Sequence, residues 1–590
     1  MARLSTTSPA AYVTFTLHSH LPYVVNHGTW PHGLEWLHEA AAETYLPLLR
    51  VVGELEAQGI FLRANVNLSP ILLEQLAHPV FKAEFPKYVQ RKIDSARVDQ
   101  QTFVQEGERH LAEVAEFWLQ FFQRALDDFK ELGGDIIGRF RQFNDSGAIE
   151  VITCAATHGY APLLGFDSCI RAQIATGVAT HKKYFGKQPR GIWLPECGYR
   201  PAGSWNFPVP FAGQSTVETK PFYRDGVEQF LAENGIEYFF VDTHLVETSA
   251  VFTPYEMMAG GVVPSRIPIA SEIEGNQPHP SLYEPYYADT LNGTPKVSFF
   301  PRDPKTGIQV WSGDMGYPGD PCYLDFHKKR WPGGHRYWQV TDSKADLGAK
   351  TAYYPQEAKN RTKTHAAHFV HLTRQALNGV TRDNGAPPIL TAPFDAELFG
   401  HWWFEGPEWL RQVAIEYARP ESQIKLISCG DYLSKHRPSG ALAIAEGSWG
   451  KNGTNEVWLN PENNWTWTHI YPAEKTVRQM ARAGRWKGDA TAIRLAKQTC
   501  RELLLLESSD WQFLITTEAA RDYAEKRFNV HLEQLRALID AWRRFESVGQ
   551  VSPECLAMLE KIEDLDGVFS DVNPDLWAEE PSRKRLSLVR

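Results

Sequence analysis

The sequence predicts an α/β fold in which a parallel β/α barrel precedes a helix-rich C-terminal part. Short apolar runs recur at helix-sized intervals, as they do when parallel strands alternate with helices. Polar and aromatic residues follow many of these runs, and barrel enzymes carry their functional groups at the carboxyl ends of the strands. The expected strands are 12–18, 60–67, 149–155, 191–194, 238–242, 297–300, 308–311, 389–392 and 424–428.

The first expected strand, residues 12–18, shows the clearest alternation. It directs Phe15 and Leu17 to one face and His18 and His20 to the other. The span from about 72 to 143 has long amphipathic stretches and no strand pattern, so we expect a helical insertion between barrel strands.

Two segments, 201–225 and 251–280, are rich in turn-forming residues, and such long irregular excursions are usually functional loops. We expect a catalytic barrel over residues 1–430 and a helix-rich C-terminal domain over 431–590, which contributes to the substrate cleft. The helices expected in that second domain are 474–485, 490–507, 518–545 and 553–563.

The composition indicates an ordinary globular protein, and it favours an uncharged partner. The 590 residues are 43% hydrophobic and 22% charged, and the formal net charge is −10. This charge provides no electrostatic footprint for nucleic acid or an anionic membrane. The chain also has 19 Trp, 22 Tyr and 31 Phe. Since flat rings with a polar edge suit sugar faces, a neutral polymer is the expected partner.

The cysteines indicate a reducing compartment, and the N-terminal residues give no indication of export. The seven cysteines are scattered and include no C-x-x-C pair, so neither a disulfide framework nor a zinc knuckle is expected. The first residues lack an apolar leader segment, and the chain has no apolar run of membrane-spanning length. We therefore expect a cytoplasmic protein with no membrane anchor.

Two carboxylates stand out because each follows a short apolar run and lies among aromatic residues. Glu196 follows Trp193, and Asp395 lies in a segment that also holds Trp402 and Trp403. Either acid alone could simply cap the next helix. A pair of such carboxylates, however, suffices for glycosyl transfer, with one as nucleophile and the other as general acid/base.

Five ordered motifs resemble glycoside hydrolase family 57, and within it the α-1,4-glucan (glycogen) branching enzymes. This resemblance implies an incomplete (β/α)7 barrel with a helix-rich C-terminal domain, a retaining mechanism, and no metal or organic cofactor. It also implies an α-glucan such as amylose, glycogen or starch as the substrate. The motifs are His18–Val24, Glu150–Tyr160, Trp193–Glu196, Trp311–Gly319 and the Asp395 segment.

The resemblance also assigns roles to individual residues. Glu196 matches the nucleophile and Asp395 the general acid/base, and the aromatics beside Asp395 would raise its pKa as a general acid requires. Glu196 must stay ionised, and Arg200 or a nearby protonated histidine could support that charge. Tyr255 matches a loop tyrosine of branching members. The expected substrate-contacting residues further include Trp30, Trp311, Asp314, Trp403, Trp449 and Trp458.

The histidines allow a second interpretation. His18, His20, His158, His244 and a late-strand acid could together hold Zn²⁺ in a metal-dependent hydrolase. The carboxylate-aromatic segments favour the sugar site instead, because a metal hydrolase does not need them. We therefore expect His18, His20 and His158 to recognise sugar hydroxyls and no metal to be bound. Asp242 could hold a hydroxyl or orient a histidine, or could be an ordinary strand-end acid.

Some positions depart from the family pattern, and alternatives remain open. Cys154-Ala155 stands where Ser-Asn is frequent, and Cys197 where Met is frequent, but neither departure removes a catalytic group. Hydrolases and glucanotransferases of the family share the same carboxylates, so they remain alternatives to branching. A non-catalytic glucan-binding protein is a third possibility, against which the two intact carboxylates count. The sequence leaves the oligomeric state open.

Overall fold

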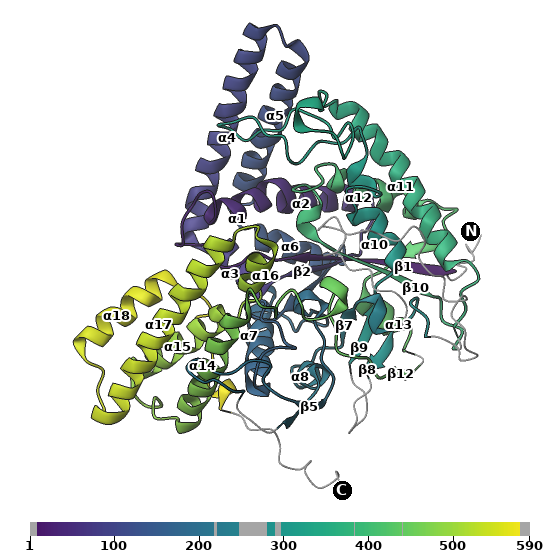
Figure 1. Ribbon diagram of the computed structural model, residues 1–590. Helices are drawn as coiled ribbons and strands as arrows, with labels where there is room; N and C mark the ends of the chain where they lie inside the picture. The colour runs from purple at the N-terminus through teal and green to yellow at the C-terminus, as the bar shows by residue number, and fades with distance from the viewer. Residues whose placement is uncertain are drawn as a thin grey trace.

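The computed structural model describes residues 9–217, 221–246, 280–288, 297–382, 384–438 and 440–578. Within these residues, parallel strands form a central barrel whose helices lie outside it (Figure 1). Seven strands make up the barrel among the described residues: β1 (Ala11–Ser19), β2 (Asn65–Leu68), β3 (Glu150–Cys154), β4 (Ile192–Trp193), β7 (Tyr238–Val241), β9 (Ser298–Pro301) and β10 (Ile389–Asp395).

The barrel order is β10-β1-β2-β3-β4, followed by β7 and β9. Single parallel bridges link β4 to β7 through Gly191 and Tyr238, and β9 to β10 through Arg302 and Thr391. The ring thus closes through two weak seams, which gives the expected incomplete (β/α)7 barrel. Three short strands lie beside it: β11 (Ile424–Leu426) pairs with β1, β8 (Tyr286–Ala288) with β9, and β12 (Ala441–Leu442) with β8.

Apolar side chains of the strands and the outer helices form the core. Phe15 of β1 stacks on Phe369 at 5.5 Å and meets Trp409 edge-on at 6.2 Å between ring centroids. This burial attaches the helices to the sheet. The helices concerned are α1 (Leu34–Ala40), α2 (Leu46–Glu56), α7 (Asp167–Phe185), α8 (Val227–Glu233), α10 (Pro304–Trp311), α11 (Pro355–Leu377), α12 (Gly406–Ala418) and α13 (Cys429–Lys435).

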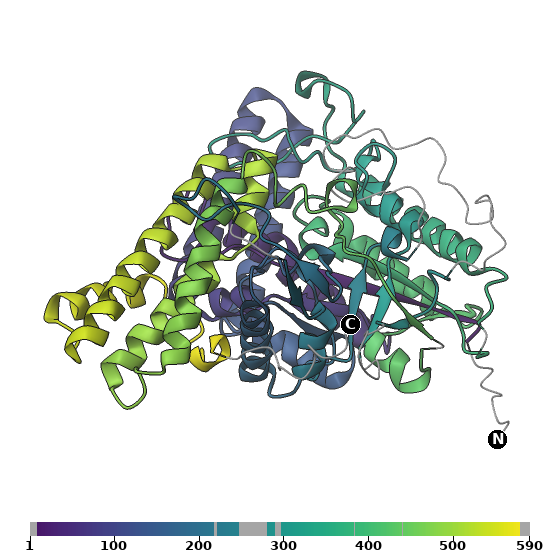
Figure 2. The same cartoon turned by 60° about the horizontal axis from the view of Figure 1, so that its bottom comes forward.

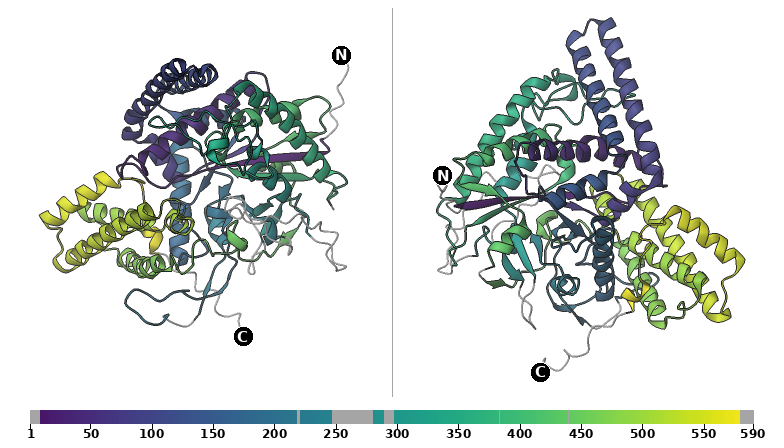
Figure 3. Two further views of the ribbon diagram at one scale, coloured as in Figure 1. Left: turned by 45° about the horizontal axis from the view of Figure 1, so that its top comes forward. Right: turned by 180° about the vertical axis from the view of Figure 1, so that it is seen from behind.

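Four helices fill the span between β2 and β3. α4 and α5 pack along each other, and their far end projects beyond the rest of the molecule (Figures 1 and 3). Gly107 joins them in the left-handed conformation at φ 81°, which glycine adopts without strain. The helices are α3 (Pro70–Ala77), α4 (Pro79–Glu106), α5 (Arg109–Glu131) and α6 (Ile136–Ser146).

The C-terminal helices pack together at one side of the barrel (Figure 2). They contact the loop that follows β1: the Tyr23 hydroxyl donates to the Leu565 carbonyl, and Arg527 donates to the Tyr23 carbonyl. The first and last parts of the chain therefore meet. The helices are α14 (Asn464–Ala483), α15 (Ala490–Leu506), α16 (Asp510–Thr517), α17 (Arg521–Val548) and α18 (Pro553–Leu565).

One expected strand is wrong. Residues 308–311 belong to helix α10, which begins at Pro304. The Asp303 side chain accepts from the Thr306 amide at 2.7 Å, and proline fits the first helical position, so this turn starts a helix despite its apolar residues. The excursion 201–225 is not wholly irregular, because β5 (Gly203–Trp205) and β6 (Phe222–Arg224) form an antiparallel pair.

Among the described residues, none of the helices combines the length and the apolar composition that a membrane span requires. All seven cysteines are free, and six of them are buried.

Candidate active site

Glu196 lies directly after β4 on a single turn formed by residues 195–197. Its backbone is left-handed at φ 60°, and Cys197 follows at φ 51°. Residues other than glycine adopt this conformation at an energetic cost, and such strain concentrates at functional sites. The turn directs the carboxylate to the end of the barrel, where only 14% of the side chain is exposed.

Trp449 holds Glu196 by two hydrogen bonds. Its indole Nε1 donates to Glu196 Oε2 at 2.6 Å, and its backbone amide donates to the Glu196 carbonyl at 3.0 Å. His158 Nδ1 lies 3.9 Å from Glu196 Oε1. Burial raises the pKa of Glu196 to about 7, although the Trp449 hydrogen bond lowers it. The carboxylate therefore ionises only near neutral pH, with an aimed donor to stabilise its charge.

Arg200 does not support Glu196 as expected. Its guanidinium donates to the carbonyls of Pro201 and Asp225 and lies 3.8 Å from Asp167. It therefore anchors the β5–β6 excursion. The stabilising donor to Glu196 comes from Trp449 instead.

Asp395 is the last residue of β10 and pairs in register with His18 of β1. Burial and the neighbouring carboxylates Glu397 and Glu196 raise the pKa of Asp395 well above its usual value. A raised pKa favours the protonated form of Asp395, which a general acid requires.

Glu397 is an acid beside the site that the sequence analysis missed. Tyr45 donates to its Oε1 at 2.5 Å, and burial raises the pKa of Glu397 to about 7. A third carboxylate in the Asp395 segment was visible in the sequence, but nothing there showed that Tyr45 would meet it.

The three expected histidines form a stack beside Glu196. The rings of His20 and His158 lie 3.9 Å apart between centroids at 11°, and those of His18 and His158 lie 5.0 Å apart. His18 bridges Asn67 at 2.7 Å and His158 at 3.1 Å. Burial lowers the pKa of both His18 and His158 well below the usual value, so these two rings are neutral.

The C-terminal helices supply partners to this stack that sequence reasoning did not find. Ser509 lies 2.8 Å from His158 Nδ1, and Asp510 Oδ2 lies 2.9 Å from His20 Nε2. Ser69 Oγ is 2.9 Å from the other ring nitrogen of His20. The pair Ser509-Asp510 is polar and follows an apolar run, which was its only signal in the sequence.

The metal interpretation receives no support from these contacts. Both ring nitrogens of His18 and of His20 face hydrogen-bond partners, which leaves neither ring a free lone pair aimed at a shared point. Among the described residues, the side chains near enough to share an ion lie elsewhere, in two clusters.

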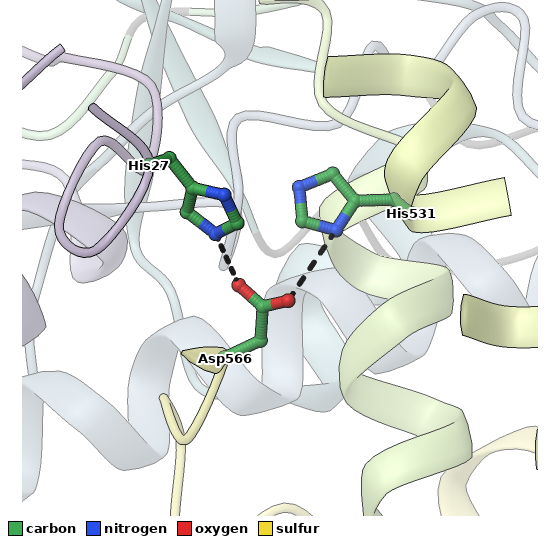
Figure 4. Close-up of side chains that lie close together, drawn as sticks. All are labelled: His27, His531 and Asp566. Carbon is green, nitrogen blue, oxygen red and sulfur yellow. Dashed lines mark hydrogen bonds and ion pairs between the residues drawn. The ribbon is translucent and has the colours of Figure 1, made fainter. Parts of the chain in front are cut away.

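The first cluster is His27, His531 and Asp566 (Figure 4). His27 Nε2 lies 2.6 Å from Asp566, while His531 Nδ1 lies 2.9 Å from Glu502. Arg527 Nη2 lies 2.9 Å from His531 Nε2 and can only donate, so that nitrogen must accept and Nδ1 must carry the proton. A guanidinium so close also repels a cation. These residues instead form a buried clasp between the loop after β1 and the C-terminal helices.

The second cluster is Cys169, Glu474 and Glu507. Burial raises the pKa of Cys169 and Glu474 well above their usual values and that of Glu507 to about 8. Protonated groups are poor metal ligands, so this cluster fits a metal poorly.

Trp30 lies on an open groove of about 550 Å³ together with Trp331. The two side chains are 66% and 62% exposed. Lys92, whose Nζ donates to the Gly333 carbonyl at 3.0 Å, forms part of the groove wall. Glu35 and Glu39 add acidic groups to the basic ones, so the groove is mixed in charge.

Trp311 and Asp314 occupy different positions. The Trp311 ring is near Phe394, Trp402 and Trp449, with centroids 6.4, 6.3 and 6.5 Å apart, and so lies between the two carboxylate segments. Asp314 lines a separate hollow of about 360 Å³ with Tyr317 and His368.

Three expected substrate contacts lie in packed surroundings. Asp242 is buried and pairs with Arg302 at 2.9 Å through both oxygens, which leaves little capacity for a sugar hydroxyl. Trp403 is buried against Tyr323 and Trp409. Trp458 is 1% exposed and stacks on Tyr160 at 4.3 Å. All three side chains are therefore covered by the surrounding protein in this structure. Tyr255 lies outside the described residues.

Comparison with known proteins adds independent findings. A sequence model described as glycosyl hydrolase family 57 matches residues 14–445, and one described as 1,4-alpha-glucan branching enzyme, C-terminal, matches residues 469–577. The chain is 40% identical over 564 residues to the 1,4-alpha-glucan branching enzyme of Thermococcus kodakarensis, covering 95% of this chain and 78% of that protein.

Comparison with solved structures finds the same family. The crystal structure of the T. kodakarensis branching enzyme has a TM-score of 0.86 at 39% identity, and that of a family 57 branching enzyme from Pyrococcus horikoshii has 0.85 at 39%, each covering 97% of both chains. The α-amylase AmyC from Thermotoga maritima has 0.78 at 28% identity, covering 97% of this chain and all of that one.

Proposed function

Because the chain belongs to glycosyl hydrolase family 57, we propose that it is a 1,4-alpha-glucan branching enzyme that acts by a retaining double displacement. The observation that carries the proposal is the unlike pair of strand-end carboxylates. Glu196 is held by an indole N–H, and Asp395 has its pKa raised by burial and neighbouring acids. The match of the C-terminal region to that of branching enzymes supports transfer to a glucan acceptor.

In the first step Glu196 attacks the anomeric carbon of an α-1,4-linked glucose unit. The bond to the leaving glucan breaks as the bond to Glu196 forms, and Asp395 gives its proton to the departing 4-oxygen. The Trp449 N–H stabilises the ionised Glu196 before attack. This step yields a covalent glycosyl-enzyme and a shortened chain.

In the second step Asp395, now ionised, takes the proton of a glucose 6-hydroxyl on another chain segment. That oxygen attacks the anomeric carbon and displaces Glu196, which forms the α-1,6 branch with the original anomeric configuration. A retaining mechanism predicts carboxyl groups roughly 5–5.5 Å apart.

Because the ring nitrogens of the histidine stack face protein partners, we propose that the stack lines the subsite of the donor sugar without binding its hydroxyls directly. Trp311 would offer that sugar an apolar surface. The exposed rings of Trp30 and Trp331 would hold a more distant part of the glucan, since indole faces suit sugar rings and a groove of mixed charge suits a neutral polymer. Buried Trp403 and Trp458 would act by supporting these residues.

The alternative is hydrolysis, for which the likeness to the Thermotoga α-amylase is the specific observation. Water and a sugar hydroxyl compete for the same intermediate, and shielding by a loop would favour the sugar. The sequence prediction assigns that shielding to Tyr255. Tyr255→Ala should then lower branching far more than hydrolysis, and an equal fall in both would favour the α-amylase interpretation.

Incubation of the protein with amylose tests the proposal directly. The products are analysed for α-1,6 linkages by NMR and, after digestion with a debranching enzyme, for chain length. Branching predicts new α-1,6 signals and a debranched population shorter than the starting chains. Reducing ends accumulating without α-1,6 linkages would instead identify a hydrolase. Glu196→Gln serves as the inactive control.

We also propose that the protein works in glycogen biosynthesis in the cytoplasm. Its seven free cysteines are compatible with a reducing compartment, and a polymeric α-glucan substrate would be met there.

A further inference from the structure

Asp510 reaches the histidine stack from the opposite end of the chain. It is the first residue of α16, and its Oδ2 lies 2.9 Å from Nε2 of His20, which is 490 positions earlier in the sequence. The Asp510 side chain is 14% exposed and that of His20 only 8%. This is a largely buried charged contact, and such contacts keep their geometry better than exposed ones.

The carboxylate is itself held in place. The Ser508 hydroxyl donates to Asp510 Oδ2 at 2.5 Å. The Ser509 amide donates to the His158 carbonyl at 3.2 Å, and Ser508 and Gly159 form an antiparallel bridge. The segment 508–510 is therefore attached to the strand-end segment that carries His158.

The contacts of His20 define its orientation. Ser69 faces Nδ1, Asp510 faces Nε2, and the ring of His158 covers one face at 3.9 Å. Because a carboxylate only accepts, Nε2 must carry a proton. The same two groups also act on the nucleophile candidate: Asp510 raises the pKa of Glu196, and His20 lowers it.

We propose that Asp510 is a positioning residue that fixes the orientation and the Nε2 proton of His20, so that the C-terminal helices complete the catalytic site of the barrel. The inference rests on the proposed function, in which Glu196 and the histidine stack face the reacting sugar. Asp510 does not itself touch that sugar. It acts through His20, whose ring covers His158 beside Glu196, so a change in the orientation of His20 would disturb the surroundings of the nucleophile.

Asp510→Asn is the first test, because it removes the charge while nearly preserving the shape. The amide can also present N–H to Nε2 and so favour the wrong tautomer. We expect kcat on amylose to fall roughly 10- to 100-fold. We expect KM to stay within about twofold, because the interaction matters most in the transition state. Asp522→Asn is the matched control: this exposed acid lies in the first turn of the next helix, α17, and should leave kcat unchanged.

A second variant keeps the test decisive if Asp510→Asn does not fold. Ser508→Ala leaves the carboxylate but removes its anchor, and should lower kcat by about 3-fold while thermal unfolding stays as in the unchanged protein. An unchanged kcat in a folded Asp510→Asn protein would overturn the proposal. A rise in KM at constant kcat in that protein would also overturn it. If Asp510→Asn does not fold, an unchanged kcat in Ser508→Ala would overturn it.

Glu196→Gln separates this inference from the proposed function. If that variant stays active, the proposed function fails. If it is inactive while Asp510→Asn keeps full kcat, only the role of Asp510 fails.

Discussion

Glu196 and Asp395 both lie at the carboxyl ends of barrel strands, and burial raises the pKa of each, yet their backbone conformations and hydrogen-bond partners differ. Glu196 follows the two-residue strand β4 on a left-handed turn and accepts a hydrogen bond from Trp449. Asp395 ends the seven-residue strand β10 in extended conformation, and no hydrogen bond to its carboxylate is found among the described residues. Burial favours the proton on both acids, but at Glu196 the Trp449 donor opposes this effect. This difference is what the proposed roles of nucleophile and general acid require.

The largest expected effect comes from removing either carboxylate. Glu196→Gln and Asp395→Asn should each lower branching of amylose by about 10³-fold or more, because each deletes a chemical role. The two variants should differ on α-maltosyl fluoride, whose leaving group needs no proton. Asp395→Asn should still release fluoride in a first turnover, whereas Glu196→Gln should not. A fluoride burst from Glu196→Gln would reverse the assignments.

Removing the donor to Glu196 tests the comparison of the two acids through the pH dependence of kcat/KM. Glu196 must be ionised to attack, so kcat/KM should fall as pH drops below its pKa of about 7. Asp395 must be protonated, so activity should fall again above its raised pKa. Trp449→Phe removes a contact that lowers the pKa of Glu196, so the acid limb should move to higher pH and the maximum should fall about 10-fold.

Trp458→Phe is the matched control for that experiment. The indole Nε1 of Trp458 is buried and has no hydrogen-bond partner among the described residues. The same substitution there should leave the acid limb in place. An equal shift in both variants would mean that the loss of a buried indole, and not the bond to Glu196, moves the pH profile.

A smaller effect is expected at the groove of Trp30 and Trp331. Trp331→Ala should weaken binding of the inactive Glu196→Gln protein to amylose about 5-fold in affinity gel electrophoresis, since one exposed stacking surface is lost. Tyr354→Ala removes an exposed aromatic ring that lies outside the groove and serves as control. Equal mobility of the Trp331→Ala and parent proteins would remove this groove from the substrate path.

Metal removal should have no effect. Prolonged treatment with EDTA should leave branching activity within about twofold, because the ring nitrogens of His18 and His20 face hydrogen-bond partners. Loss of activity that Zn²⁺ specifically restores would contradict this expectation and revive the metal interpretation of the histidines.

Sequence reasoning located the family and the fold because local signals carry them. Strand alternation and the acids beside aromatics are visible in neighbouring residues. The incomplete (β/α)7 class was implied by the family resemblance, and the comparisons confirm the family. The roles of Glu196 and Asp395 remain predictions.

The differences between the expected and the observed structure have physical causes. Short strands and helices share the apolar pattern of residues 308–311. Here the Asp303 side chain caps the first turn, which starts a helix. Trp458 and Trp403 are buried because tertiary packing, which spacing does not reveal, covers them. Asp510 could not be assigned to His20, since a contact across 490 positions leaves no local pattern.

The clasp of His27, Asp566 and His531 has a consequence for the time course of synthesis. A ribosome makes roughly 5–20 residues per second. The loop after β1 therefore emerges roughly half a minute to two minutes before its partners exist. Until then, His27 and the loop around it lack their polar partners from the C-terminal part of the chain. Chaperone binding during translation should therefore persist until the last helices emerge, and a ribosome stalled before residue 566 should hold a protease-sensitive N-terminal loop.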